Sequence, residues 1–402
     1  MARCDALAQC SEEAGALTRI FLSPEQLAAT ALVTAWMQQA GMAVKADAIG
    51  NVIGRYEGDR PGLPCLMFGS HLDTIRNAGK YDGMLGVVAA IDCVQALADA
   101  GKRLPFAIEV IGFADEEGVR FGATLLGSRA VAGTFDAKLL EARDGAGVTF
   151  ADAMRAYGLD PQRIADAARR PNEVLAYAEL HIEQGPVLEA EGLPVGVVTA
   201  INGFSRARLT ITGQAGHAGT VPMALRRDAL AAAAECVLAV EAIARGEPEL
   251  VGTVGRIEAG PGAINVIPGH AMFTLDVRSP RDAVREGGLA TMLERCEAIC
   301  AKRGLPLAVE RLQDHPATAC AGWLMQQFDS AVAAEGGRVL HLPSGAGHDG
   351  MAMRAIADIA MLFVRCEGGI SHNPAEAITE ADAATGARVL SRFIENFQVP
   401  AK

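Results

Sequence analysis

Long hydrophobic runs are absent from this 402-residue sequence, and none approaches the ~20 apolar residues of a membrane-spanning helix. The amino-terminal stretch MARCDALAQCSEEAG carries acidic residues and no apolar segment, so we expect no secretory signal peptide. The nine cysteines are an odd number, and no two of them form a C-x-x-C pair. These features together predict reduced thiols and a cytoplasmic protein.

Positive charge is also scarce, because 36 lysines and arginines face 48 acidic residues and the formal net charge is −12. Nucleic acids and anionic membranes both bind basic surfaces, so we expect neither as the main partner. The glycine-rich stretch GATLLGS is not followed by the Lys-Ser/Thr pair of a phosphate loop, and no G-x-G-x-x-G follows a predicted strand. The G-x-S-x-G motif of serine hydrolases is missing too.

The composition is that of a globular protein, with 50% hydrophobic and 21% charged residues, and the length predicts two or three domains. Ser23, Pro24 and Gly41 mark the ends of a predicted helix over residues 23–42. Continuous apolar stretches at 63–70, 105–118 and 173–185 then alternate with helical patterns such as 83–101. This alternation predicts an α/β fold, with a mixed, mostly parallel sheet covered by helices on both faces.

The pattern changes near Arg206. Residues 207–213 and 271–279 alternate between apolar and polar side chains, as half-buried antiparallel strands do, and two helical stretches at 228–246 and 280–304 accompany them. We therefore predict an inserted α+β domain over residues 207–316. The main domain is predicted in two parts, 1–206 and 317–402, and its second part contains a core strand at 358–366 and a final helix at 380–397.

Four histidines, at positions 71, 181, 217 and 372, follow predicted strands or lie in glycine-rich loops. A single histidine in such a place is usually a surface or hydrogen-bonded residue. The joint pattern is more specific, because ligands of α/β proteins bind beyond the carboxyl ends of the strands.

Carboxylates occupy similar places. Asp73 and Asp82 flank the loop after His71, and the consecutive residues 115–117 end another predicted strand with three acids. Adjacent acids repel one another unless a cation lies between them, and histidine with carboxylate suits zinc or manganese. A solvated acidic turn is the alternative interpretation of the three acids.

A series of motifs resembles one known family. In chain order these are GSHLDT, KYDG, DEEGVRFGATLLGSRAVAG, LHIEQGPVLE, GHAGTVPM, NVIPG, LDVRS, SGAGHDGMAM and GGISHNPAE. The chain resembles, over nearly its full length, the dinuclear metallohydrolases that include acylases and carboxypeptidase-type enzymes. It is most similar to the branch of N-carbamoyl-amino-acid hydrolases, ureidopropionases and allantoate amidohydrolases.

The resemblance implies two divalent metal ions per subunit, zinc or manganese, with cobalt and nickel also suitable. It implies five protein ligands. His71 and His181 would bind the first ion, Glu117 and His372 the second, and Asp82 would bridge both.

Three further implications concern the surroundings of the metals. Glu116 would be the general base rather than a ligand. Asp73 would orient His71 through its ring N–H. The family also implies a cis peptide bond after the bridging aspartate, between Asp82 and Gly83.

For the inserted domain the resemblance implies a lid that also forms a homodimer. His217 would hydrogen-bond the oxyanion in the partner subunit's active site, accompanied by Asn265. Arg278 would clamp the substrate carboxylate, for which its planar guanidinium is suited, although a salt bridge at a strand end is the alternative. Gln184 would bind polar groups of the substrate. His348, Arg206 and Arg76 receive no role.

The motif wording favours allantoate amidohydrolase, a hydrolase of linear C–N bonds other than peptide bonds that releases ammonia and carbon dioxide in purine breakdown. The alternatives are N-carbamoyl-L-amino-acid hydrolase and β-ureidopropionase. A non-catalytic relative that acts as a binding or dimerisation module is a remote alternative. All six residues implied in metal binding and proton transfer are present, which argues against it.

Overall fold

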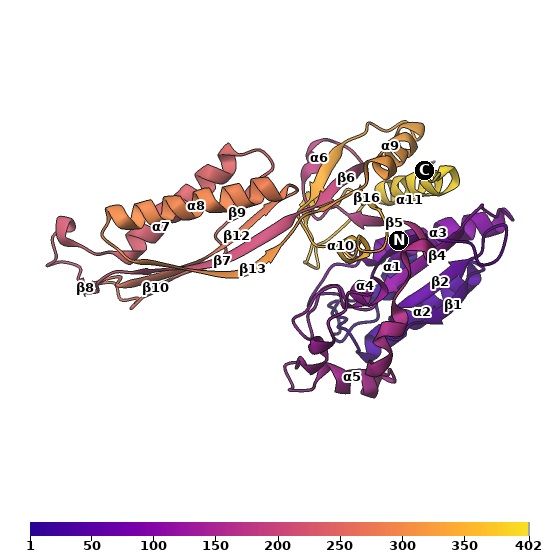
Figure 1. Cartoon of the computed structure of the whole chain (residues 1–402), viewed down its shortest axis with the longest axis horizontal. Helices are drawn as coiled ribbons and strands as arrows, with labels where there is room; N and C mark the ends of the chain where they lie inside the picture. The colour runs from indigo at the N-terminus through magenta and orange to yellow at the C-terminus, as the bar shows by residue number, and fades with distance from the viewer. Residues whose placement is uncertain (401–402) are drawn as a thin grey trace. The chain divides into compact units, whose positions relative to one another are not determined.

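The computed structural model describes residues 1–400, which form two compact units (Figure 1). Of these, residues 1–201 and 319–400 make up the main domain, and residues 202–318 make up the inserted domain. The predicted boundaries, 206 and 316, differ from these by a few residues. Strand β7 (Gly203–Thr212) begins before the predicted alternating stretch. The prediction starts later because a glycine and a serine near the beginning of the strand resemble loop residues.

The main domain is built on one mixed sheet with the strand order β1-β2-β4-β3-β5-β16-β6-β14, and β15 pairs with β6. Its strands are β1 (Ala43–Ala46), β2 (Val52–Tyr56), β3 (Cys65–His71), β4 (Ala107–Phe113), β5 (Val174–Ile182), β6 (Val195–Ile201), β14 (Thr318–Ala319), β15 (His341–Ser344) and β16 (Ile359–Val364). The four central strands β4, β3, β5 and β16 are parallel to one another. Their carboxyl ends therefore meet at one edge of the sheet.

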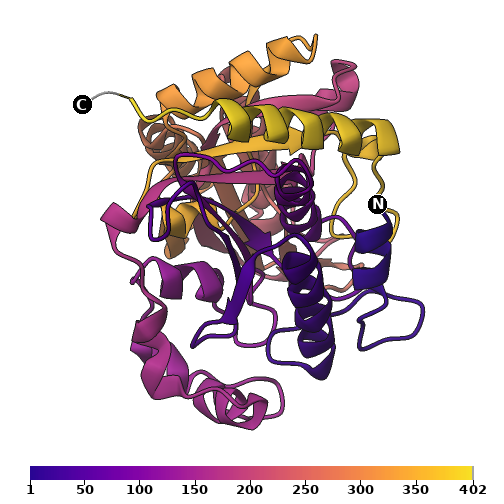
Figure 2. The same ribbon diagram turned by 90° about the vertical axis from the view of Figure 1, so that its right-hand side faces the viewer.

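Helices cover both faces of this sheet, as the continuous apolar strands predict. They are α1 (Ala2–Ala8), α2 (Pro24–Gln39), α3 (Met84–Asp99), α4 (Leu126–Val131), α5 (Phe150–Tyr157), α6 (Val187–Ala190), α9 (Gly322–Ala334), α10 (Gly350–Met353) and α11 (Glu380–Asn396). Figure 2 shows the long helices α2, α3, α9 and α11 along one face, where they enclose the largest hydrophobic core. Helices α4, α6 and α10 contribute to the core on the other face.

Helices α2 and α11 begin where the sequence predicts, and a side-chain hydroxyl caps each of them. The Ser23 hydroxyl accepts a hydrogen bond from the backbone N–H of Gln26, which caps α2, and Pro24 occupies its first turn. The final helix is capped in the same way by the Thr379 hydroxyl. Among residues 1–400, no helix combines the length and the apolar character needed to cross a membrane.

The inserted domain consists of an antiparallel sheet with two helices packed on one face. Its elements are β7, β8 (Gly216–His217), α7 (Ala229–Gly246), β9 (Val251–Thr253), β10 (Ile257–Gly260), β11 (Val266–Ile267), β12 (His270–Ser279), α8 (Asp282–Lys302) and β13 (Leu307–His315). The sheet order is β10-β12-β7-β13, β9 pairs with β12, and β8 and β11 form a separate short ladder. Alternate residues of β7 and β12 are buried against α7 and α8, which confirms the predicted half-buried strands.

Candidate metal centre

The central strands deliver histidines and acids to the carboxyl edge of the main sheet. Strand β3 ends at His71, and His181 is the second-last residue of β5. Strand β4 ends at Phe113, so residues 115–117 lie in the turn that follows it. His372 follows β16 in a loop. Because these strands are parallel, residues far apart in the sequence meet here.

Asp82 lies at the centre of this cluster. Its Oδ1 is 3.5 Å from His71 Nε2 and 3.2 Å from His181 Nε2, while its Oδ2 is 3.3 Å from His372 Nε2. Glu117 Oε1 is 3.5 Å from the same His372 nitrogen. One carboxylate thus touches two groups of donors, one with each of its oxygens.

These donors are spaced as metal ligands are. The ligand atoms of His71, Asp82 and His181 lie within 4.8 Å of one another, and so do those of Asp82, Glu117 and His372. Mixed imidazole and carboxylate donors suit zinc or manganese. The residues present therefore fit two neighbouring divalent ions that share Asp82.

Gly83 allows Asp82 to lie this close to His71. Its backbone has φ of +74°, which glycine adopts without a steric cost. A Cβ atom at this position would lie 2.6 Å from three atoms of the His71 ring. Gly83 also precedes the first residue of α3, so the chain turns from the ligand directly into a buried helix.

The carboxylates after β4 are crowded, as their pKa values show. Burial, with the nearby Asp82 and Asp73 charges, raises the pKa of Glu117 to about 7, although His71 opposes the shift. Burial also raises the pKa of Glu116 well above its usual range, again opposed by His71 and supported by Glu117. For Asp115, burial and the Asp73 charge raise the pKa in the same direction. A cation at this site would relieve the repulsion.

The pKa of Asp82 is lowered, in contrast to those of the acids after β4, whereas the pKa of His71 is raised. Burial alone would raise the pKa of Asp82, but hydrogen bonds with His181, His372 and His71 hold it well below its usual range. Burial alone would lower the pKa of His71, but Asp82 and Glu116 raise it well above 6.5. The site therefore favours a negative Asp82 next to positive charge.

Asp73 lies beside the His71 ring and contacts it through the backbone. The His71 Nδ1 atom lies 2.9 Å from the backbone carbonyl of Asp73 and 3.7 Å from its carboxylate. The two carboxylate oxygens instead accept hydrogen bonds from the backbone N–H groups of Glu116 and Glu117, at 2.9 and 3.1 Å. Asp73 thus fixes the turn after β4, which has already left the strand geometry, and Gly118 with φ of +68° completes that turn.

The expected cis bond between Asp82 and Gly83 is not found. Within residues 1–400 the cis peptide bond is Gly260–Pro261. The trans form is the lower-energy state for a bond that does not precede proline, and here the positive φ of Gly83 turns the chain.

Gln184 reaches the centre from the loop after β5. Its side-chain nitrogen donates to Asp82 Oδ2 and to Ser371 Oγ, both at 3.1 Å. Its side-chain oxygen is buried and has no hydrogen-bond partner within residues 1–400. A buried acceptor without a donor is costly.

Three buried residues around the centre have no predicted role. Glu376, in the same loop as His372, accepts hydrogen bonds from the backbone N–H groups of Tyr81 and Asp82, at 2.8 and 3.2 Å. Glu179 precedes His181 by two residues on β5 and accepts from Ser70 Oγ at 2.8 Å. His348 packs its ring against that of His181, with the centroids 4.5 Å apart. The motifs SHNPAE and AELHIEQG contain the two acids, but nothing in their spacing distinguishes them from solvated residues.

The inserted domain places its three predicted residues at two separate locations. His217 and Asn265 are neighbours across the β8–β11 ladder, where the Ala218 N–H donates to the Asn265 carbonyl at 2.9 Å. Strand β12 begins at His270, just after this ladder, and Arg278 lies near its other end. The eight residue-to-residue steps from His270 to Arg278 span about 26 Å in an extended strand.

Arg278 belongs to a cluster on the sheet face. Its Nε and Nη2 atoms donate to the two oxygens of Asp276, at 2.8 and 3.1 Å. Arg206 Nε donates to the same carboxylate at 2.8 Å. Both guanidinium groups lie over the ring of Phe204. The expected alternative of a salt bridge is therefore present, and it holds the guanidinium group in a fixed orientation.

Over nearly its full length, the chain is similar to several known proteins. The chain is 45% identical over 379 residues to an N-carbamoyl-L-amino acid amidohydrolase from Geobacillus stearothermophilus, which covers 94% of this chain and 93% of the relative. It is 39% identical over 427 residues to allantoate deiminase from Arabidopsis thaliana, covering 98% and 81%. The crystal structure of an amidase of the hydantoinase/carbamoylase family from Burkholderia multivorans superimposes with a TM-score of 0.92 at 34% identity, covering 98% and 95%.

A family description matches most of the chain, from residue 67 to residue 396. This span contains the metal centre and the whole inserted domain. The chain therefore belongs to Peptidase family M20/M25/M40.

Proposed function

We propose that this protein is a metal-dependent hydrolase that cleaves a linear ureido C–N bond in a substrate carrying a carboxylate. The observation that carries the proposal is Asp82, which lies between two sets of histidine and carboxylate donors. The names of the similar proteins, amidohydrolases and deiminases, support hydrolysis of C–N bonds other than peptide bonds.

The proposal assigns two divalent ions to the centre, zinc or manganese, with cobalt and nickel as alternatives. His71 and His181 would hold one ion, Glu117 and His372 the other, and Asp82 both. When bound, such ions polarise a carbonyl group and lower the pKa of water toward neutrality.

Glu116 is suited to move the proton. The residue is only 9% exposed, and its carboxylate lies in the donor group with His71 and Glu117, yet outside both groups that contain Asp82. Burial raises its pKa well above the usual range, so it can take a proton from water and hold it. It would then pass this proton to the leaving nitrogen of the ureido group.

Arg278 is the proposed partner of the substrate carboxylate. Asp276 and the Phe204 ring fix its guanidinium group, so little side-chain entropy is lost when an anion binds. Gln184 would bind the ureido group through its buried side-chain oxygen, which otherwise has no donor.

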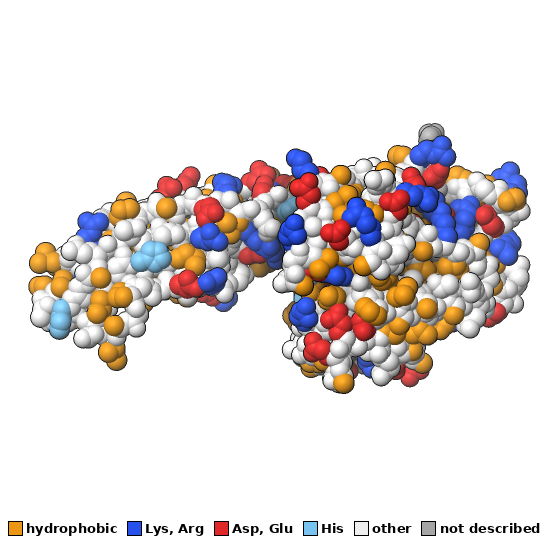
Figure 3. All heavy atoms as spheres, turned by 90° about the horizontal axis from the view of Figure 1, so that it is seen from below, with side chains coloured by type: hydrophobic (Ala, Val, Ile, Leu, Met, Phe, Trp, Pro, Cys, Tyr) orange, Lys and Arg blue, Asp and Glu red, His pale blue; other side chains and the backbone are white. Residues whose placement is uncertain are grey.

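The inserted domain is proposed to form a homodimer in which His217 and Asn265 serve the partner's active site. The β8–β11 ladder and Arg278 lie about 26 Å apart along β12. Residues that far apart on one domain cannot both contact the same small substrate, so we assign His217 and Asn265 to the partner's site. Figure 3 shows hydrophobic side chains gathered at the β8 and β10 end, where Met223, Leu225 and Ile264 are exposed.

Subunit complementation tests this arrangement. The variants His217→Ala and Glu116→Gln should each be inactive, whereas their mixture should regain about a quarter of wild-type activity, because half of the dimers are mixed and contain one intact site. A mixture that exchanges subunits but stays inactive would show that His217 acts within its own chain.

Two substrates remain candidates. The motif wording favours allantoate, while the 45% identity to an N-carbamoyl-L-amino acid amidohydrolase favours N-carbamoyl-L-amino acids. Both carry a ureido group and a carboxylate, so both fit the same residues. Steady-state kinetics with manganese, comparing them with N-carbamoyl-β-alanine, decide the matter through a tenfold or greater preference in kcat/KM.

The same measurement tests the remote alternative of a non-catalytic binding module. A metal-loaded protein that turns over none of the three ureido compounds would refute the proposed activity.

A cytoplasmic location is proposed as well. All nine cysteines are free, and eight of them are buried, as expected for a protein that folds in a reducing compartment.

A further inference from the structure

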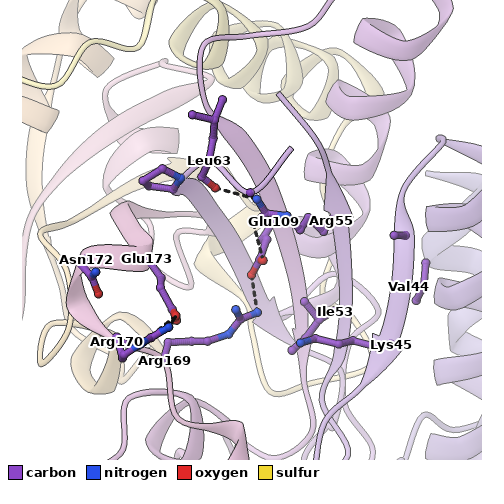
Figure 4. Close-up of a pocket in the computed structure, with 13 residues that line it drawn as sticks. Val44, Lys45, Ile53, Arg55, Leu63, Glu109, Arg169, Arg170, Asn172 and Glu173 are labelled. Carbon is purple, nitrogen blue, oxygen red and sulfur yellow. Dashed lines mark hydrogen bonds and ion pairs between the residues drawn. The ribbon is translucent and has the colours of Figure 1, made fainter. Parts of the chain in front are cut away.

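A pocket of the main domain lies at the amino ends of the strands that deliver the candidate metal ligands (Figure 4). Its volume is about 610 Å³. Pro64 precedes β3, Glu109 lies near the start of β4, and Glu173 precedes β5. Since β3 spans about 20 Å, the pocket is well separated from the centre at the carboxyl ends of these strands.

The pocket carries more positive than negative charge, in a chain whose net charge is −12. Four cationic side chains line it, those of Lys45, Arg55, Arg169 and Arg170, but only two acidic ones. This excess is local, so it does not follow from the composition. It indicates a surface that attracts a small anion.

One acid, Glu109, is buried at 2% exposure and joins two of the arginines. Its Oε1 is 3.0 Å from Arg55 Nη1, and its Oε2 is 2.6 Å from Arg169 Nη2. Arg55 is occupied further by Glu57 and by the Leu63 carbonyl, at 2.7 Å each.

Two cations keep donors for a ligand. Arg169 is held by a single hydrogen bond from its guanidinium group, so within residues 1–400 its Nε and Nη1 atoms donate to no protein group. Lys45 forms no ion pair with any carboxylate of residues 1–400. Figure 4 shows both side chains extending into the pocket. Arg170, in contrast, is paired with Glu173 at 2.7 Å.

This arrangement is preorganised, because the buried carboxylate of Glu109 fixes Arg169 before any ligand arrives. A fixed guanidinium with an ammonium group nearby is a typical partner for phosphate or carboxylate oxygens. The lining also includes the apolar side chains of Ile53 and Leu63. An occupant therefore combines a charged head with an apolar part.

We propose that this pocket binds a small organic anion, with its phosphate or carboxylate head between Arg169 and Lys45 and its apolar part against Ile53 and Leu63. The site is separate from the metal centre and does not depend on the proposed reaction.

Isothermal titration of the metal-loaded protein with phenyl phosphate tests the proposal, with inorganic phosphate as the probe that lacks the apolar part. Phenyl phosphate should bind several-fold more tightly than inorganic phosphate. Lys45→Met should weaken its binding about tenfold, since one charge-assisted hydrogen bond is lost. Arg169→Lys, which retains a partner for Glu109 and so protects the fold, should weaken binding as well. Lys138→Met removes an exposed lysine outside the pocket and should change nothing.

Crystals of the metal-loaded protein soaked in phenyl phosphate locate the bound molecule. Density between Arg169 and Lys45 is the expected result. Density at Asp82 alone, or equal affinity of the wild type, Lys45→Met and Arg169→Lys for phenyl phosphate, would overturn the proposal.

Discussion

Glu376 offers the sharpest test of how this structure holds its central aspartate. Its carboxylate is buried and accepts three hydrogen bonds, from the N–H groups of Tyr81 and Asp82 and from the Ser371 hydroxyl at 3.0 Å. It also packs against Gly79, where a Cβ atom would overlap it. The substitution Glu376→Ala removes all of these contacts at once.

The magnitude follows from the groups left behind. Two buried backbone N–H donors lose their acceptor, at a cost of about 1–3 kcal/mol each. Burial and the Asp82 charge raise the pKa of Glu376, so removing its own charge returns part of this cost. We expect a net loss of about 2–4 kcal/mol in the free energy of unfolding. Glu376→Gln retains an acceptor oxygen and should cost about 1 kcal/mol.

Urea unfolding of the metal-free protein measures this loss, and calorimetric titration with manganese measures the effect on the centre. Glu376→Ala should weaken metal binding, because the backbone of Asp82 is no longer fixed. Glu367→Ala is the matched control, since Glu367 is an exposed acid nearby in the sequence. If the free energies of unfolding of Glu376→Ala and this control differ by less than about 1 kcal/mol, or if Glu376→Ala binds manganese as tightly as the wild type, Glu376 does not hold Asp82.

Three further predictions concern the reaction. Glu116→Gln should lower kcat by about 10²–10⁴-fold while metal analysis still finds the ions bound, and retained turnover would remove Glu116 from the role of base. Asp276→Asn should raise KM about tenfold through a less ordered Arg278; Glu310→Gln, which removes an exposed ion pair of the same sheet, should not. Burial raises the pKa of Glu117 to about 7, and Asp82 raises the pKa values of His71, His181 and His372. Metal binding requires the ionised carboxylate and the neutral imidazoles, so manganese affinity should rise with pH through 7 and continue to rise above it as the histidines lose their protons. A flat pH profile between 5 and 7 in calorimetry would contradict this assignment.

The local pattern of the sequence predicted the fold class, a sheet covered by helices with an inserted α+β domain. Continuous apolar strands indicated a covered sheet, and polar residues at the ends of those strands identified His71, His181 and the acids after β4. The rule behind this success is general, because parallel strands present their carboxyl ends at one edge. The motif resemblance then grouped the donors around Asp82 in the same two sets that the structure brings together.

The sequence by itself therefore determined the strands, the helices and the types of side chain at the centre, since each depends on near neighbours in the chain. Only the tertiary structure decided which partner each polar group takes. The Asp73 carboxylate binds the turn at Glu116 while its backbone carbonyl faces the His71 ring, and Glu376 supports Asp82 across nearly 300 residues of sequence. Such contacts leave no periodic trace in the sequence, because they depend on where loops meet in space, and packing of the whole chain fixes that meeting point.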